Sequence, residues 1–259
     1  MKTISTVSFI FLFLFAGALA AHAYTIDDTY IGANPSGFYP QWETADVIGP
    51  ASVFQIHGMD ISITGNQLSS VKIYTEYVKP LSDIGASGTQ LGDLFISTNG
   101  YTSGASTSDT WQTGEKWEYA LVFDNHLPTS SSGTINLYKV AYGVSGGQGN
   151  ILLTNNFKQP DWAVYRECQE TRINTQLTDY YLGNIGTWGI DSTNGILSFD
   201  ITGNGWLKAT DFGFHWNMTC GNDTIEGGAS APVPEPSTLL LLGSGLLGLA
   251  FCSKRRTKA

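Results

Sequence analysis

Short runs of alternating apolar and polar residues, separated by turn-forming residues, fill the chain between residues 24 and 226. Residues 59–64 alternate, Gly65 and Asn66 follow, and residues 71–78 resume the alternation, which predicts a β-hairpin. No stretch keeps a helical apolar stripe beyond a couple of turns. Further strands are expected at 94–98, 117–123, 135–144, 162–168, 197–202 and 212–216.

This pattern predicts an all-β body. Strands at this spacing, without intervening helices, are typical of a single antiparallel two-sheet β-sandwich of the jelly-roll or lectin-like kind. We find no internal repeat, so we expect one domain over residues 24–226.

The first 23 residues have the order of a secretory signal peptide. Lys2 supplies a cationic start, an apolar stretch follows, and Ala21-His22-Ala23 ends it with small residues at the positions that signal peptidase requires. We expect export by the Sec machinery and cleavage after Ala23. An uncleaved membrane anchor is the alternative, but the apolar run is short for a bilayer span.

A second apolar segment lies near the other end of the chain. Residues 227–232 read as a flexible linker, residues 238–253 as a transmembrane segment, and residues 254–259 as a basic tail. Basic residues after an apolar span hold that end in the cytoplasm. The body is therefore expected outside the inner membrane, to which the chain is anchored before processing.

Residues 233–259 resemble a PEP-CTERM sorting signal. The resemblance rests on Val-Pro-Glu-Pro-Ser-Thr at 233–238, the Leu/Gly-rich run after it, and the Lys-Arg-Arg tail, in that order. It implies processing by an exosortase, for which Pro234, Glu235 and Pro236 would be recognition residues. A plain single-span anchor is the alternative.

Charge excludes one class of partner. The chain holds 13 Lys and Arg against 22 Asp and Glu, a net charge of −9, and five of the cations lie in residues 1–23 and 237–259, which contain no carboxylate. The body is therefore distinctly acidic. Nucleic-acid binding needs a basic face, so we expect none.

Cys168 and Cys220 are the two cysteines of the body. A pair of cysteines in an exported protein is a candidate disulfide, and we predict that they are joined. Two buried free thiols are the alternative.

No catalytic constellation is evident, so no catalytic residue is predicted. Glycoside hydrolysis, the enzyme reaction that best suits a lectin-like sandwich, needs two facing carboxylates. Glu115 and Glu118 are three apart and would lie on opposite faces of a strand, while Glu76 or Asp124 could join either only through tertiary contacts. Solvated surface carboxylates explain these four residues better.

No metal site is predicted either. The histidines are scattered, which excludes a zinc motif. One bound calcium is the alternative that stays open, because several oxygen-bearing residues stand near predicted strand ends, although most suit turns equally well. They are Asp93, Asn99, Asp109, Asp124 and Asp223.

Aromatic residues give the remaining functional indication. The chain has seven Trp, 12 Tyr and 13 Phe, and exposed rings can stack on the apolar faces of sugars. Trp111, Trp188 and Trp206 stand among Gly, Thr and Asn and are candidate glycan contacts; packing of all seven tryptophans in the core is the alternative. Trp42, Trp117, Trp162 and Trp216 stand in apolar or strand-like contexts and are expected in the core.

Together these features predict an exported bacterial surface or extracellular-matrix protein without enzymatic activity. The resemblance to exosortase substrates implies an association with exopolysaccharide and biofilm. A secreted carbohydrate-active enzyme on the same kind of sandwich is the alternative.

Overall fold

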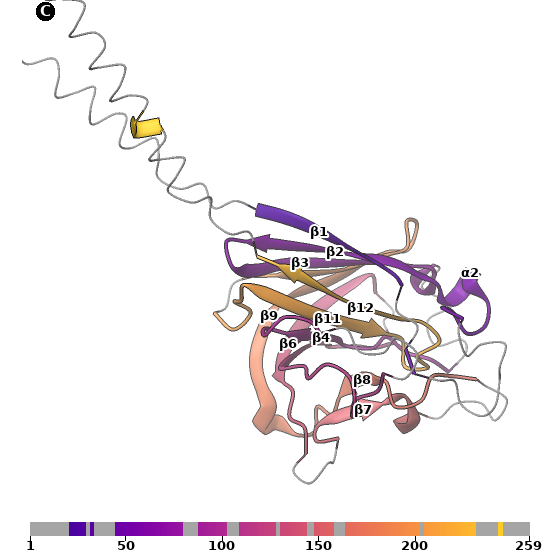
Figure 1. Ribbon diagram of the computed structural model, residues 1–259. Coiled ribbons are helices and arrows are strands. Elements are labelled where there is room, and N and C mark those ends of the chain that lie inside the picture. Colours follow the sequence, from indigo (N-terminus) through magenta and orange to yellow (C-terminus); the bar gives the residue numbers. More distant parts are fainter. Residues whose placement is uncertain are drawn as a thin grey trace, which may run out of the picture. The chain divides into compact units, whose positions relative to one another are not determined.

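A computed structural model gives an all-β body (Figure 1). It describes residues 21–29, 32–33, 45–79, 88–102, 109–127, 130–143, 148–157, 164–202, 205–231 and 243–245. Residues 21–231 form one compact unit. Helices in the described body are short: α2 (Ala51–Phe54), η2 (Glu76–Val78), η5 (Thr154–Asn156) and η6 (Thr178–Tyr180).

Ten strands form one antiparallel sheet. Their order across the sheet is β1-β2-β3-β10-β9-β6-β5-β4-β11-β12. The strands are β1 (Ala21–Asp27), β2 (Ile56–Thr64), β3 (Gln67–Thr75), β4 (Leu94–Ser97), β5 (Tyr119–Phe123), β6 (Ser132–Lys139), β9 (Tyr181–Asp191), β10 (Ile196–Ile201), β11 (Asp211–Asn217) and β12 (Thr224–Ser230).

The predicted hairpin is confirmed. β2 and β3 pair across the turn at Gly65 and Asn66, with Ile61 opposite Val71. Strands were also found where the sequence predicts them at β4, β5, β6, β10 and β11. The stretch 162–168 is different, because Tyr165 and Cys168 lie outside any strand.

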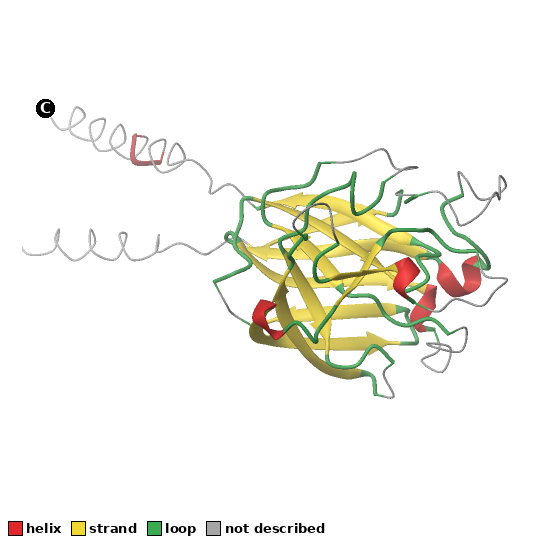
Figure 2. Ribbon diagram, turned by 90° about the horizontal axis from the view of Figure 1, so that it is seen from below, coloured by secondary structure: helices red, strands yellow, loops and turns green. Residues whose placement is uncertain are grey.

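The sheet curls on itself instead of forming the predicted two-sheet sandwich (Figure 2). Alternate residues of its strands point inward and fill one large core, which includes Ile61, Phe199 and Trp216. The two edge strands, β1 and β12, approach each other closely. A Cβ added to Gly227 of β12 would lie 2.5 Å from Cγ2 of Ile26 of β1. The result is nearly a barrel, in which one sheet supplies the facing layers that a sandwich takes from two.

A two-stranded sheet covers part of the outer surface. It consists of β7 (Ile151–Leu153) and β8 (Glu170–Ile173). Its apolar residues join a second core cluster with Phe95, Ala120 and Val122, which point outward from β4 and β5. Residues 120–123 are therefore buried on both faces, as a continuous apolar run indicates.

The body begins and ends at the same end of the curled sheet. All neighbouring strands are antiparallel, so β1 and β12, the first and last of ten, run in opposite directions. The start of β1 and the end of β12 therefore lie at one end of the strands, as Figure 1 shows.

The predicted linker at 227–232 needs correction. Residues 227–230 belong to β12, where Gly227 pairs with Phe214 and Ser230 with Asp211. Ala231 then donates its N–H to the carbonyl of Thr210 (2.5 Å). A Gly-rich sequence suggested a flexible linker, but glycine at 227 instead provides the space that Ile26 occupies.

Two predicted segments fall largely outside the described residues. The signal peptide, residues 1–23, is described only from Ala21, which already belongs to β1. The predicted transmembrane segment, 238–253, is described only at 243–245. In the described ranges, the helices are all too short or too polar to span a bilayer.

The predicted disulfide is not present. Cys168 and Cys220 are both free cysteines. Cys220 is 2% exposed within the large core, and burial raises the pKa of its thiol to about 12. Cys168 is partly exposed in the turn before β8, where its N–H donates to Oδ1 of Asn155 (2.6 Å). The alternative of two buried thiols therefore describes Cys220 alone.

Gly92 lies where the two sheets meet. Its N–H donates to the carbonyl of Asn217 (3.1 Å), and its own carbonyl accepts from Nε1 of Trp216 (2.9 Å). An added Cβ would lie 2.1 Å from the Asn217 oxygen and 3.0 Å from the Thr171 oxygen, both of which are backbone atoms. Close contact between β11 and β8 therefore requires glycine here.

Gly92→Ala should lower the free energy of unfolding by about 3 kcal/mol, because backbone must move to admit the methyl group. Urea denaturation would measure the loss. Gly205→Ala is the matched control: nothing lies within 4 Å of its added Cβ, so its effect should stay within about 0.5 kcal/mol. Equal effects of the two substitutions would contradict this account of the contact.

Candidate functional site

The predicted glycan contacts occupy three different environments. Trp206 is 50% exposed in the segment between β10 and β11, with its ring centroid 6.5 Å from that of Tyr119. Trp111 is partly buried against the smaller core cluster. Trp188 is 2% exposed and donates from Nε1 to Oδ1 of Asp124 (2.8 Å), so its prediction as a glycan contact is wrong.

The core prediction for the other tryptophans is confirmed where it can be examined. Trp117 is 2% exposed and Trp216 is fully buried. Trp42 and Trp162 lie outside the described residues. The turn-like sequence around Trp188 suggested an exposed ring, but this sequence belongs to β9. Strand alternation turns the Trp188 ring inward.

The four carboxylates considered for glycoside hydrolysis each have their own hydrogen-bond donors. Glu118 accepts from the Thr98 N–H and from Nδ2 of Asn99 (both 2.7 Å). The other three accept from different groups: Glu115 from the Thr102 N–H, Glu76 from Lys79 and His57, and Asp124 from Trp188 and Thr134. These contacts account for each carboxylate as a structural group.

Most of the candidate calcium ligands are also held by protein groups. Asp93 is fully buried, with Oδ1 2.6 Å from Nε2 of His126 and Oδ2 accepting from the Ile173 N–H (2.8 Å). Asn99 is bonded to Glu118, and Asp109 is 4% exposed. Of the five, only Asp223 belongs to the carboxylate cluster described next.

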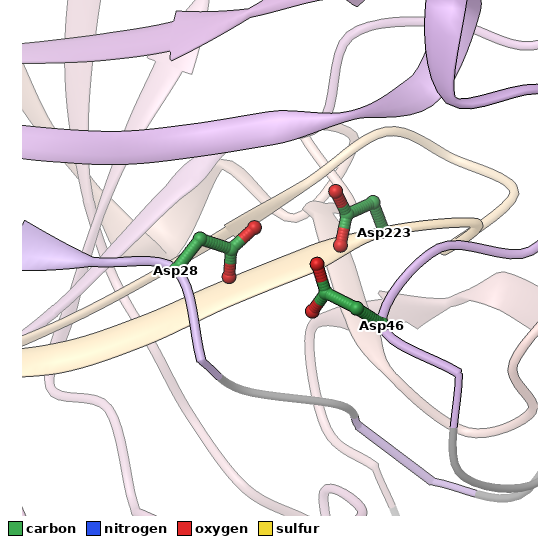
Figure 3. Close-up of side chains that lie close together, drawn as sticks. All are labelled: Asp28, Asp46 and Asp223. Atoms are coloured by element: carbon green, nitrogen blue, oxygen red, sulfur yellow. The ribbon is translucent and has the colours of Figure 1, made fainter.

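Three aspartates converge at the end of the curled sheet opposite the chain ends. Asp28 follows β1, Asp46 precedes α2, and Asp223 lies in the connection between β11 and β12. One carboxylate oxygen from each lies within 4.8 Å of the others, and Figure 3 shows the three groups pointing toward one another. In the part of the chain that the structure describes, this is the one group with geometry suited to a metal ion.

Backbone and side-chain donors fix two of these carboxylates. Asp223 accepts from the Ile56 N–H at Oδ2 (2.6 Å) and from the Thr224 N–H at Oδ1 (2.9 Å). Asp46 accepts from Nε2 of Gln55 at Oδ2 (3.1 Å). Its Oδ1 is buried without a hydrogen-bond donor among the described residues.

The electrostatics of the cluster disfavour a negative charge on Asp223. Burial, and then the charge of Asp46, raise the pKa of Asp223 to about 8, although the two N–H donors and Arg166 oppose the rise. Arg166 is fully buried and donates to the carbonyls of Ala33 and Ala45. Near neutral pH Asp223 is thus protonated, unless another positive charge enters the cluster.

A divalent cation is the ligand that such carboxylates can accept. Calcium takes six to eight oxygen ligands, of which these residues supply three. The sequence indicated Asp223 but not Asp28 or Asp46, because the three are brought together by the approach of β1 to β12. The spacing of these residues in the sequence therefore gives no indication that they lie together.

The open alternative of a bound calcium can be tested here. If calcium binds, a concentration about 100 times its dissociation constant adds about 2.7 kcal/mol to the stability. That gain raises Tm by roughly 5–10 °C over the value in chelator. Asp46→Asn should remove most of the increase, whereas Asp179→Asn, at an exposed position, should retain it. An unchanged Tm in calcium relative to chelator would contradict a calcium site at this cluster.

Comparison with known proteins gives one match. Residues 232–256 match the family model described as the PEP-CTERM protein-sorting motif. Neither the curated proteins nor the solved structures gave a significant match. Pro234, Glu235 and Pro236 fall within the matched segment and outside the residues that the structure describes.

Proposed function

Since the chain carries a PEP-CTERM sorting motif, we propose that it is a non-enzymatic surface or extracellular-matrix protein of a bacterium. The motif implies exosortase-dependent sorting of an exported protein. It is the observation that carries the proposal. The fate at the surface, the absence of enzymatic activity and the association with exopolysaccharide are our additions.

The body is built so that processing near the motif would leave it intact. Among the described residues, the last hydrogen bond of the body runs from the Ala231 N–H to the Thr210 carbonyl, and Ala231 precedes the Pro-Glu-Pro element. Cleavage at or after this element would remove the apolar segment and the basic tail but no residue of β12. The processed chain would keep its complete large sheet.

Signal peptidase would shorten β1 without removing it. Cleavage after Ala23 takes away three residues that pair with β2 but leaves the pairs from Tyr24–Ile61 to Asp27–Gly58. Ile26, the residue that contacts Gly227, stays in place.

Sorting can be tested by the mature C-terminus. In a host with its exosortase, mass spectrometry of the extracellular protein should find an end close to Pro234–Pro236. Glu235→Ala should cause a cell-associated form ending at Ala259 to accumulate, because the recognition element is lost. Ser237→Ala, just outside that element, is the matched control. Extracellular protein that still ends at Ala259 in the host with exosortase would overturn the proposal.

An aromatic pair supports contact with polysaccharide. Trp206 and Tyr119 lie at the end of the sheet where the body begins and ends, since Trp206 precedes β11 and Tyr119 begins β5. Trp206 exposes half of its surface, and its ring is inclined by 53° to that of Tyr119. Such a ring can stack on the C–H face of a pyranose.

Trp206→Ala should weaken retention of the purified body on the host's own exopolysaccharide while leaving the unfolding curve nearly unchanged. Leu177→Ala is the matched control, because Leu177 is also apolar and 41% exposed but lies in the segment before η6 and is no part of the pair of Trp206 and Tyr119. It should retain full binding. Retention equal to wild type in Trp206→Ala would contradict a glycan contact at this ring.

Trp188→Ala should behave in the opposite way. Loss of a buried ring and of its bond to Asp124 should lower the unfolding free energy by about 3–5 kcal/mol. Chemical denaturation would separate this structural effect from a binding effect at Trp206.

A further inference from the structure

The two buried histidines, His215 and His126, both contribute to hydrogen bonding with the same strand, β8. His215 lies 2.6 Å from the carbonyl oxygen of Glu170 through Nε2. His126 binds Asp93, whose other carboxylate oxygen accepts from the Ile173 N–H. His22 and His57, in contrast, are exposed. Histidine–carboxylate pairs therefore hold both ends of β8 against the large sheet.

His215 is enclosed on every side. It is fully buried on β11, its Nδ1 lies 2.6 Å from Oε1 of Glu226 on β12, and its ring packs against Phe95 and Trp117. Tyr101 donates to the other oxygen of Glu226 (3.2 Å). β8 closes the remaining side.

The hydrogen bonds of His215 require a shared proton. Nδ2 of Asn217 lies 3.2 Å from Nε2 and donates to the same Glu170 carbonyl (3.1 Å). The carbonyl oxygen, 2.6 Å from Nε2, can only accept, so Nε2 must carry a hydrogen. An ionised Glu226 can also only accept, so Nδ1 must then carry a second one. The pair therefore holds one proton more than a neutral imidazole beside a carboxylate. If the pair loses that proton, one ring nitrogen of His215 becomes an acceptor. It then faces another acceptor 2.6 Å away, either Oε1 of Glu226 or the carbonyl oxygen of Glu170.

We propose that the proton shared by His215 and Glu226, together with the carboxyl group of Glu170, forms a pH-sensitive latch. The latch holds the β7–β8 sheet against the large sheet while these groups are protonated. It loosens that sheet when the protons leave.

The neighbouring charges favour the protonated state. Burial opposes a charged His215, but its bond to Glu226 and the charges of Glu226 and Glu170 raise its pKa above the usual 6.5. Burial raises the pKa of Glu170 from 4.5 to about 7; the positive charge of His215 opposes the rise, and the charges of Glu226 and Asp109 add to it.

The titratable groups around this cluster come from several elements. Glu226 comes from β12 and Glu170 from β8. Tyr101, Asp109 and Tyr142 come from the adjoining segments. Arg172, the cation of β8, bonds instead to Oε1 of Gln90 and lies over the ring of Phe157.

Docking here means the packing of the β7–β8 sheet against the large sheet. Glu170 and His215 change the docking equilibrium in the same direction as the pH rises. Docked Glu170 keeps its proton up to about pH 7, whereas an undocked glutamate loses it near 4.5. Docking is therefore favoured at low pH, and the advantage falls as the pH rises through this window. His215, with its raised pKa, adds a loss that begins near 6.5. Undocking would uncover the smaller core cluster, including Trp117 and Phe95.

Hydrogen exchange of the full chain, corrected for intrinsic rates, tests the latch. Protection of the amides of residues 170–173 should fall at least about tenfold between pH 5 and pH 8, because one proton changes the equilibrium by up to tenfold per pH unit. The β2–β3 hairpin provides the internal control and should keep its protection. The His215 imidazole shift, followed by NMR, should move over the same range.

Two substitutions remove the titrating groups while keeping their size. In Glu226→Gln, a neutral His215 can donate to Glu170 and accept from the new amide, so both bonds survive without a shared proton. Combined with Glu170→Gln, it should reduce the change in β8 protection to less than about twofold. His57→Gln, at an exposed histidine, should leave the wild-type response unchanged.

Two results would overturn the latch. One is wild-type β8 protection that is constant from pH 5 to pH 8. The other is a double variant, folded by near-ultraviolet circular dichroism, that keeps the wild-type pH response. If the double variant does not fold, the wild-type exchange and the His215 titration decide the question, because a latch requires the two to coincide.

Discussion

The contact between the first and last strands is the constraint on which the body depends. An antiparallel sheet of ten strands has two edges, and only a tight approach lets its inner face enclose one core. That approach is made where Ile26 of β1 packs against Gly227 of β12, a position without room for a side chain. The same contact brings Asp28 beside Asp223 and places the beginning and end of the body together. Core, acidic cluster and chain ends thus follow from one closure.

The outer surface near β4 and β11 follows a different principle. There the large sheet presents Phe95, His215 and Glu226 outward, and β8 covers them. Burying charged groups costs free energy unless each finds a partner, so this layer combines a small apolar cluster with charge-assisted bonds. The inner core is held by apolar packing that does not titrate. The outer layer is consequently the part of the body whose attachment depends on protons.

Local patterns in the sequence predicted the parts of the fold that are local in the chain. The hairpin of β2 and β3 was predictable because both strands and their turn are contiguous, and the sorting motif because its three parts stand in order. The curl was not, because the pairing of β3 with β10 joins segments more than 100 residues apart. Trp188 and Trp206 share a turn-like composition, yet Trp188 lies in β9 with its ring buried, whereas Trp206 lies in the segment before β11 with its ring exposed. Asp28 and Asp46 carry no spacing signal at all, since tertiary contact alone unites them with Asp223.

The closure also limits where processing can occur. Cleavage before Ala231 would remove the N–H that donates to the Thr210 carbonyl, at the end of the segment that carries Trp206. Cleavage before Gly227 would remove the residue against which Ile26 packs and open the sheet at its edge. The Pro-Glu-Pro element at 234–236 stands beyond both points. A sorting enzyme that acts there can separate the body from its apolar segment without touching the contact that keeps the body folded.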